Sequence, residues 1–142
     1  MEVSLVRKQV TAAIERARRG AQEHRERVAQ SEAAYETFLE SVAIPVIRQL
    51  AMVLKAESLP FTVSTPGGSA KLSSDNRRDD FIELRLDTAS DPPEVVGRIN
   101  RTRGSRTLTE DLALKPGARP DAISDEDVLT FFLKALEPWL ER

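Results

Sequence analysis

The chain has 142 residues, 31% of them charged, and its 21 Lys and Arg residues nearly balance 23 Asp and Glu residues, for a formal net charge of −2. This length suggests one domain, or one domain with an extension, and the charge balance excludes a wholly basic, histone-like protein and a polyacidic disordered one. There is no cysteine and a single histidine, His24, which excludes disulfides, thiol nucleophiles and a structural zinc site of the common kind.

Residues 1–58 have the apolar spacing of a helix. Small or apolar residues recur at intervals of three or four, which places them on one stripe. Between Glu15 and Arg27 no residue is both apolar and larger than alanine, so this stretch cannot anchor a core. We expect residues 1–40 to form an extended charged helix that self-associates, most simply as a dimer, because helices gain most of their stability from packing. The residues expected at this contact are Val3, Val6, Val10, Ile14, Ala17, Ala21, Val28, Tyr35 and Phe38.

Residues 41–58 are more apolar and contain Pro45. Proline fits the first turn of a helix but costs about 3 kcal/mol in a helix interior. Pro45 therefore marks either a kink in one helix or the start of a second, and the sequence leaves both open. We expect residues 41–142 to form a compact domain of helix, sheet and helix.

Residues 60–114 change to the period of two that is typical of strands. The pattern is clearest at 81–87, weak at 71–73, and also present at 61–65, 95–101 and 107–114. Turn signals separate these segments, among them Pro66-Gly67-Gly68-Ser69. The simplest arrangement is a four-stranded antiparallel meander with one polar face.

Residues 124–141 have the pattern of a C-terminal helix. Ser124 is an N-cap residue with Asp127 three positions later, an acidic variant of the capping box, and Ile123 and Val128 occupy the positions of a hydrophobic staple. Apolar residues cover more than one face, so we expect the helix to pack on the sheet and on a second element such as residues 43–54. The predicted fold class is therefore α+β.

Four arginines, Arg98, Arg101, Arg103 and Arg106, fall within one predicted hairpin. Arginine suits bidentate phosphate contacts, and arginines on strands can enter a DNA groove. Strand alternation puts Arg101 and Arg103 on one face and Arg98 on the other. However, no aromatic residue interleaves the cluster and the whole chain is slightly acidic, both unusual for nucleic-acid binding. The alternative is a solvated or ion-paired sheet face.

Other patterns point less clearly to chemistry. As a catalytic base His24 would need a nucleophile and an orienting acid nearby; its helical neighbours are Ala17, Ala21, Val28 and Ser31, so we expect a partly buried or surface histidine. The acidic groups at 79–83, 110–111 and 125–127 lack the spacing of a calcium loop, and residues 66–71 lack the order of a phosphate-binding loop. A hairpin turn is expected at 66–71, and we expect neither a cofactor nor a metal.

Three functions remain open. The leading one is a non-enzymatic protein–protein interaction module that self-associates through its N-terminal helix and presents a sheet surface to another protein. The alternative is a nucleic-acid-binding dimer that uses the 98–106 hairpin, and the weakest is an enzyme with a carboxylate site. The sequence has no apolar run of signal-peptide length at its start and no apolar stretch of about 20 residues, so we expect a cytoplasmic protein without a membrane segment.

Overall fold

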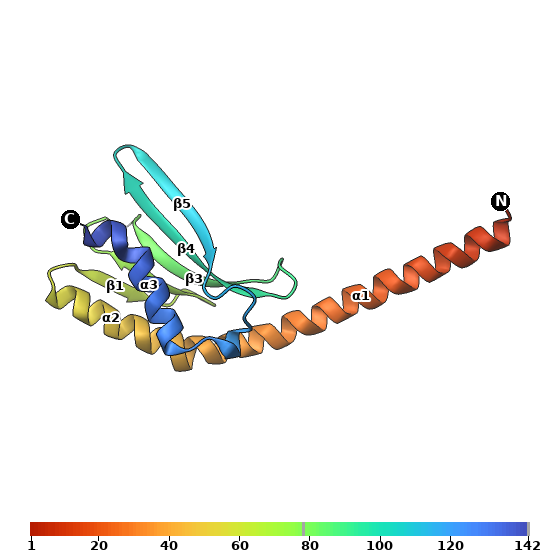
Figure 1. Cartoon of the computed structure of the whole chain (residues 1–142), viewed down its shortest axis with the longest axis horizontal. Coiled ribbons are helices and arrows are strands. Elements are labelled where there is room, and N and C mark those ends of the chain that lie inside the picture. Colours follow the sequence, from red (N-terminus) through yellow and green to blue (C-terminus); the bar gives the residue numbers. More distant parts are fainter. Residues whose placement is uncertain (78, 142) are drawn as a thin grey trace.

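The computed structural model of the chain describes residues 1–77 and 79–141. A long helix, α1 (Val3–Phe38), leads through a π-helical turn (Leu39–Ala43) into α2 (Ile44–Ala56). Five strands follow, and the chain ends in α3 (Asp125–Leu140), which lies against the sheet (Figure 1). The predicted α+β class, with its long N-terminal helix, antiparallel sheet and C-terminal helix, is confirmed. The strands are β1 (Phe61–Ser64), β2 (Ala70–Ser74), β3 (Phe81–Asp87), β4 (Glu94–Arg103) and β5 (Arg106–Ala113).

Pro45 bends one continuous helical run. The residues that join α1, the π-helical turn and α2 all keep right-handed helical dihedral angles, and Pro45 lies in the first turn of α2. Proline has no N–H to donate to the preceding turn, and a π-helical turn is a usual place for a helix to kink. Of the two possibilities that the sequence leaves open, the structure therefore shows a kink rather than a separate second helix.

The sheet has one more strand than the four predicted. Its order is β1-β2-β3-β4-β5, and every neighbouring pair is antiparallel, which is a simple meander. The strand with the weakest sequence pattern is β2, because Lys71 and two serines surround Leu72. Leu72 is nevertheless fully buried, and β2 pairs with strands on both sides. Position within the sheet, rather than local propensity, makes this segment a strand.

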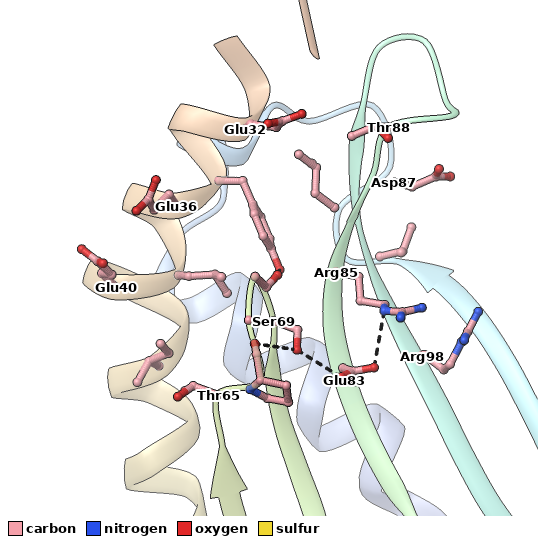
Figure 2. A pocket seen from close by; sticks show the side chains of 18 of the residues that line it. Glu32, Glu36, Glu40, Thr65, Ser69, Glu83, Arg85, Asp87, Thr88 and Arg98 are labelled. Atoms are coloured by element: carbon pink, nitrogen blue, oxygen red, sulfur yellow. Dashed lines mark hydrogen bonds and ion pairs between the residues drawn. The ribbon is translucent and has the colours of Figure 1, made fainter. Parts of the chain in front are cut away.

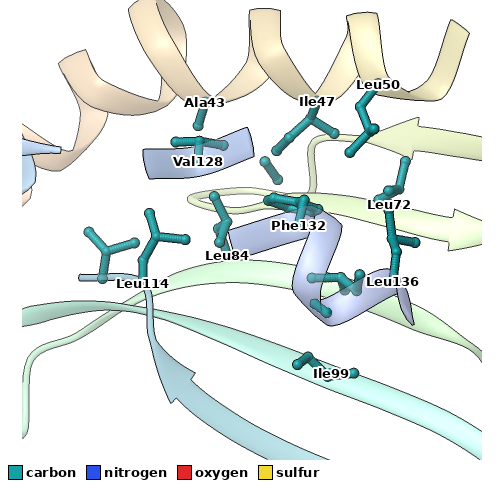
Figure 3. Close-up of a cluster of buried hydrophobic side chains, with 14 of the residues drawn as sticks. Ala43, Ile47, Leu50, Leu72, Leu84, Ile99, Leu114, Val128, Phe132 and Leu136 are labelled. Carbon is teal, nitrogen blue, oxygen red and sulfur yellow. The ribbon is translucent and has the colours of Figure 1, made fainter. Parts of the chain in front are cut away.

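The core lies between one face of the sheet and the helices. Figure 3 shows Val128, Phe132 and Leu136 of α3 between the side chains of α2 and those of the strands. All three are fully buried. The other buried apolar residues around them include Ala43, Ile47, Leu50, Leu72, Ile82, Leu84, Val95, Ile99 and Leu114.

The start of α3 has the geometry that its sequence predicts. The Asp127 backbone N–H donates to Ser124 Oγ at 3.1 Å, and the Ser124 N–H donates to the Asp127 carboxylate at 3.0 Å. This reciprocal pair satisfies two backbone donors that the helix itself leaves free. The Ser124 hydrogen bond and Lys115 hold the pKa of the Asp127 carboxyl below its usual range. Near the other end of α3, Trp139 is buried and its indole N–H donates to Asp80 at 2.9 Å.

The long helical run Val3–Ala56 includes a window that is long and apolar enough to cross a membrane, and 39% of that window is buried inside the protein. The apolar residues Ile47, Leu50 and Leu54 of α2 face the core. The core helix of a soluble protein can be equally long and apolar. The length and composition of this helix are therefore weak evidence for a membrane segment.

Candidate functional site

The apolar stripe of α1 divides into an exposed and a buried part. Val3, Val6, Val10 and Ile14 have exposed fractions of 75%, 43%, 51% and 44%, and Ala17 and Ala21 are also exposed. Val28 is half-buried. Figure 1 shows the first half of α1 extending away from the rest of the molecule. We call residues 3–23 the projecting segment, and the remainder of the described chain the body.

Two residues expected at the self-association contact lie elsewhere. Tyr35 and Phe38 are only 5% and 3% exposed, and they belong to the core of their own chain together with Leu39. They therefore offer no surface to a second copy. Helical periodicity identifies a stripe that will be covered, but it does not reveal whether the same chain or another one covers it.

A small polar cluster holds α1 where the projecting segment ends. The guanidinium of Arg27 donates two hydrogen bonds of 3.0 Å to Asp91, in the loop between β3 and β4, and His24 Nδ1 lies 3.9 Å from the same carboxylate. The Arg27 hydrogen bonds hold the pKa of the Asp91 carboxyl below its usual range. The turn Pro120–Ala122 also packs against α1. His24 is thus part of a junction between the helix and the body.

Tyr35 anchors the next part of α1 to the sheet. Its hydroxyl lies 3.1 Å from the Gly68 carbonyl and 3.2 Å from the Leu84 carbonyl, and can donate to either. Burial raises the pKa of this phenol well above its usual range, and the charge of Glu83 acts in the same direction. Gly68 belongs to the turn at 66–69, which leads directly into β2. The 66–71 segment is thus a hairpin turn followed by a strand, as predicted.

A cleft of about 1050 Å³ lies between α1 and the polar face of the sheet. Glu83 accepts a hydrogen bond from Ser69 at 3.1 Å and pairs with Arg85 at 3.4 Å. Figure 2 shows the carboxylates of Glu36 and Glu40 directed away from the sheet. Glu83 is thus paired with Arg85, and Glu36 and Glu40 are turned outward, so these charged groups do not converge on one point, as a catalytic site requires.

The four arginines of the hairpin are distributed over both faces of the sheet, as strand alternation predicts. Arg98 is paired with Asp111 across β4 and β5 and donates two hydrogen bonds of 2.9 and 3.0 Å. These bonds lower the pKa of the Asp111 carboxyl and raise that of Arg98. Arg101 pairs in register with Leu108, and Arg103 with Arg106. Because directly paired residues share a face, Arg101, Arg103 and Arg106 lie together, opposite to Arg98.

The carboxylates that could serve an enzyme have different surroundings. Asp80 is 1% exposed and accepts hydrogen bonds from Trp139 and from the Thr102 backbone N–H, while its neighbour Asp79 is exposed. Among the described residues, no group of three or more histidines and carboxylates is placed to hold a metal ion. The carboxylates at 125–127 lie in the first turn of α3, where Asp127 completes the cap.

An apolar groove of about 540 Å³ lies between α2 and α3. Val53, Leu129 and Leu133 on its walls have exposed fractions of 60%, 39% and 44%. The sequence contains a signal for this surface, because Leu133 extends the apolar part of α3 beyond one face. The helix α2 covers only part of this wider apolar surface of α3. Leu129 and Leu133 stay partly exposed in the groove.

No family model matches the chain, and no curated protein or solved structure matches it significantly.

Proposed function

We propose that the protein is a non-enzymatic interaction module that self-associates through α1. The observation that supports this proposal is the exposure of Val3, Val6, Val10 and Ile14, between 43% and 75%, on a helix that leaves the body. Four aliphatic residues on one stripe form a contiguous apolar surface, and such surfaces on soluble proteins commonly mark interaction sites. Burial of each side chain against a partner contributes about 1.5–3 kcal/mol.

The test is the mass in solution, measured by light scattering over a range of concentrations. We expect an oligomer, most simply a dimer, for the unmodified chain at tens of micromolar. The triple variant Val6→Gln, Val10→Gln, Ile14→Gln should raise the dissociation constant at least about a hundredfold, because each factor of ten corresponds to about 1.4 kcal/mol. Glutamine preserves helix propensity, so the change removes the apolar stripe and keeps the helix.

A matched control is available on the same segment. Leu5, Thr11 and Ala12 lie off the stripe, and Leu5 is 47% exposed. The variant Leu5→Gln, Thr11→Gln, Ala12→Gln should leave the dissociation constant within about threefold. A monomer at every concentration tested, or an equal effect of both triple variants, contradicts the proposal.

A second candidate, nucleic-acid binding, is supported by the shared face of Arg101, Arg103 and Arg106. Among the described residues these three arginines form no ion pair, unlike Arg98. Figure 1 shows the end of the β4–β5 hairpin extending beyond the other strands. If the three arginines contact phosphates, the log–log dependence of the affinity on salt should have a slope of about −2.7 per subunit on duplex DNA.

Fluorescence anisotropy with random-sequence duplex DNA at low salt tests this second candidate. Replacing Arg101, Arg103 and Arg106 with glutamine should abolish binding and leave the melting curve almost unchanged, since substitutions of unpaired surface side chains have small effects. The Arg98→Gln variant is the control, because Arg98 faces the other way. Absence of binding by the unmodified protein removes this candidate, and unfolding of the triple variant assigns the arginines a structural role.

A further inference from the structure

The chain carries a second unpartnered apolar surface, the groove between α2 and α3. Val46, Leu50 and Val53 of α2, together with the polar Gln49, form one wall, and Leu129 and Leu133 of α3 form the other. Asp125 and Glu126, in the first turn of α3, line one end of it. The basic residues of α2, Arg48 and Lys55, are two residues from Leu50 and Val53 and so point to the other side of that helix. The groove is therefore mostly apolar in its walls and acidic at one end.

We propose that this groove binds the projecting segment of α1 from a second copy of the chain. The inference rests on the proposed self-association and names its receiving surface. The two surfaces are complementary in charge as well as in hydrophobicity. The projecting segment contains five basic and two acidic residues, a net charge of +3. The charged residues that line the groove are acidic, Asp125 and Glu126. Opposite charges steer such surfaces together and fix their register.

The projecting segment cannot occupy the groove of its own chain. The first half of α1 extends away from the body in a straight line (Figure 1). The helix is 36 residues long, which corresponds to about 54 Å, and it continues into α2 without a break in helical geometry. Folding it back would require breaking this helix between the projecting segment and the buried residues Tyr35 and Phe38. The occupant must therefore come from another copy.

One antiparallel register of α1 with itself is unfavourable for reasons of charge. Arg7 and Arg18 lie on the same side of the helix, because eleven residues make about three turns. An antiparallel pair that matches Val3 of one copy with Ala21 of the other brings Arg7 close to Arg18 of the second copy. Like charges at this spacing repel. In the groove, the same arginines have Asp125 and Glu126 as possible partners.

Cysteine cross-linking tests this contact directly, and the chain has no cysteine of its own to interfere. One preparation carries Val10→Cys, and a second, with a mass tag, carries Leu133→Cys. Both positions are exposed, so both variants should fold and melt like the unmodified protein. After mixing and mild oxidation, we expect the mixed disulfide to exceed the Val10→Cys homodimer at least about tenfold. Val6→Cys and Ile14→Cys, one turn to either side, cover a shift in register.

The control replaces Val10→Cys with Lys8→Cys, which points to the opposite side of α1 and should cross-link at least about tenfold less. As an independent readout, Leu129→Gln with Leu133→Gln should raise the dissociation constant at least about tenfold by light scattering. If the protein self-associates but Val10→Cys cross-links with itself rather than with Leu133→Cys, this inference is wrong and self-association stands. If the unmodified protein is a monomer at all concentrations, both are wrong.

Discussion

The two ends of α1 have the same backbone conformation but different surroundings. The last turns place Tyr35 and Phe38 in the core, whereas the first turns leave Val3, Val6, Val10 and Ile14 exposed. The apolar stripe continues along the whole helix. What differs is that the body covers the stripe at the C-terminal end of the helix and not at the N-terminal end. Helix formation is a local property of the chain, but the coverage of a helix depends on what the rest of the chain places beside it.

This comparison separates two sources of helix stability. The body end of α1 is held by buried aromatic rings and by the Tyr35 hydroxyl. The projecting segment is rich in alanine, arginine, glutamate and glutamine, which are strong helix formers. Helix propensity alone gives only marginal helices in water. Contact with a partner would give the projecting segment the packing that the body end of α1 has from its core.

The largest expected effect concerns the centre of the body. Phe132 is fully buried between α2 and the sheet, so Phe132→Ala should lower the free energy of unfolding by about 3–5 kcal/mol. A urea melt measures this loss. Leu140→Ala, on the same helix but 40% exposed, should cost less than about 1 kcal/mol. Equal losses for the two variants would show that Phe132 is not at the centre of the core.

Gly97 of β4 tests how closely α3 approaches the sheet. A Cβ atom at this position would lie 2.4 Å from the ring carbons Cε1 and Cζ of Phe131. Gly97→Ala should therefore destabilise the body by about 1–3 kcal/mol through overpacking. In a chain that already carries Phe131→Ala, the same substitution should cost much less. A double-mutant cycle of chemical melts measures the difference, and additive losses would disprove the contact.

The sequence predicts the features of this molecule that depend on neighbouring residues. The Ser124 cap, the helical character around Pro45 and the two faces of the arginine hairpin follow from spacings of a few residues, and the structure shows all three. The full burial of Leu72 in β2, where the sequence pattern is weak, and the burial of Tyr35 do not follow from such spacings. Both depend on partners distant in the chain: β2 on β1 and β3, and Tyr35 on carbonyls 33 and 49 residues away.

The groove between α2 and α3 is an intermediate case. The extra width of the apolar surface on α3 is visible in the sequence, but the shape of the groove depends on the angle between two helices. That angle follows from the packing of side chains that are not neighbours in the chain. Sequence periodicity therefore indicates that α3 needs a second partner, and the structure is required to show that α2 fills this role only in part.

Tyr35 tests the connection between the two parts of α1. Tyr35→Phe removes a buried hydroxyl that can donate to the Gly68 and Leu84 carbonyls, and should cost about 1–2 kcal/mol in a urea melt. Thr37→Val is the matched control, because it removes an exposed hydroxyl that bonds only within α1, to the Ala33 carbonyl. The control should change stability by less than about 0.5 kcal/mol. A similar loss in both variants would indicate that the Tyr35 hydroxyl does not hold α1 to the sheet.

The smallest effect is expected at Gly20, the glycine of the projecting segment. A Cβ atom there has no neighbour within 4 Å, so Gly20→Ala changes only helix propensity and should stabilise the helix by about 1 kcal/mol. Hydrogen exchange of the amides in residues 3–23, at a protein concentration too low for self-association, should slow by about fivefold as a result. Gly67→Ala, an equally open turn position, should leave these amides unchanged. If Gly20→Ala has no effect even in the dilute protein, helix propensity does not determine the stability of the projecting segment. If the effect disappears only at high concentration, where exchange is limited by dissociation, a second copy covers the segment, as the comparison between the two ends of α1 predicts.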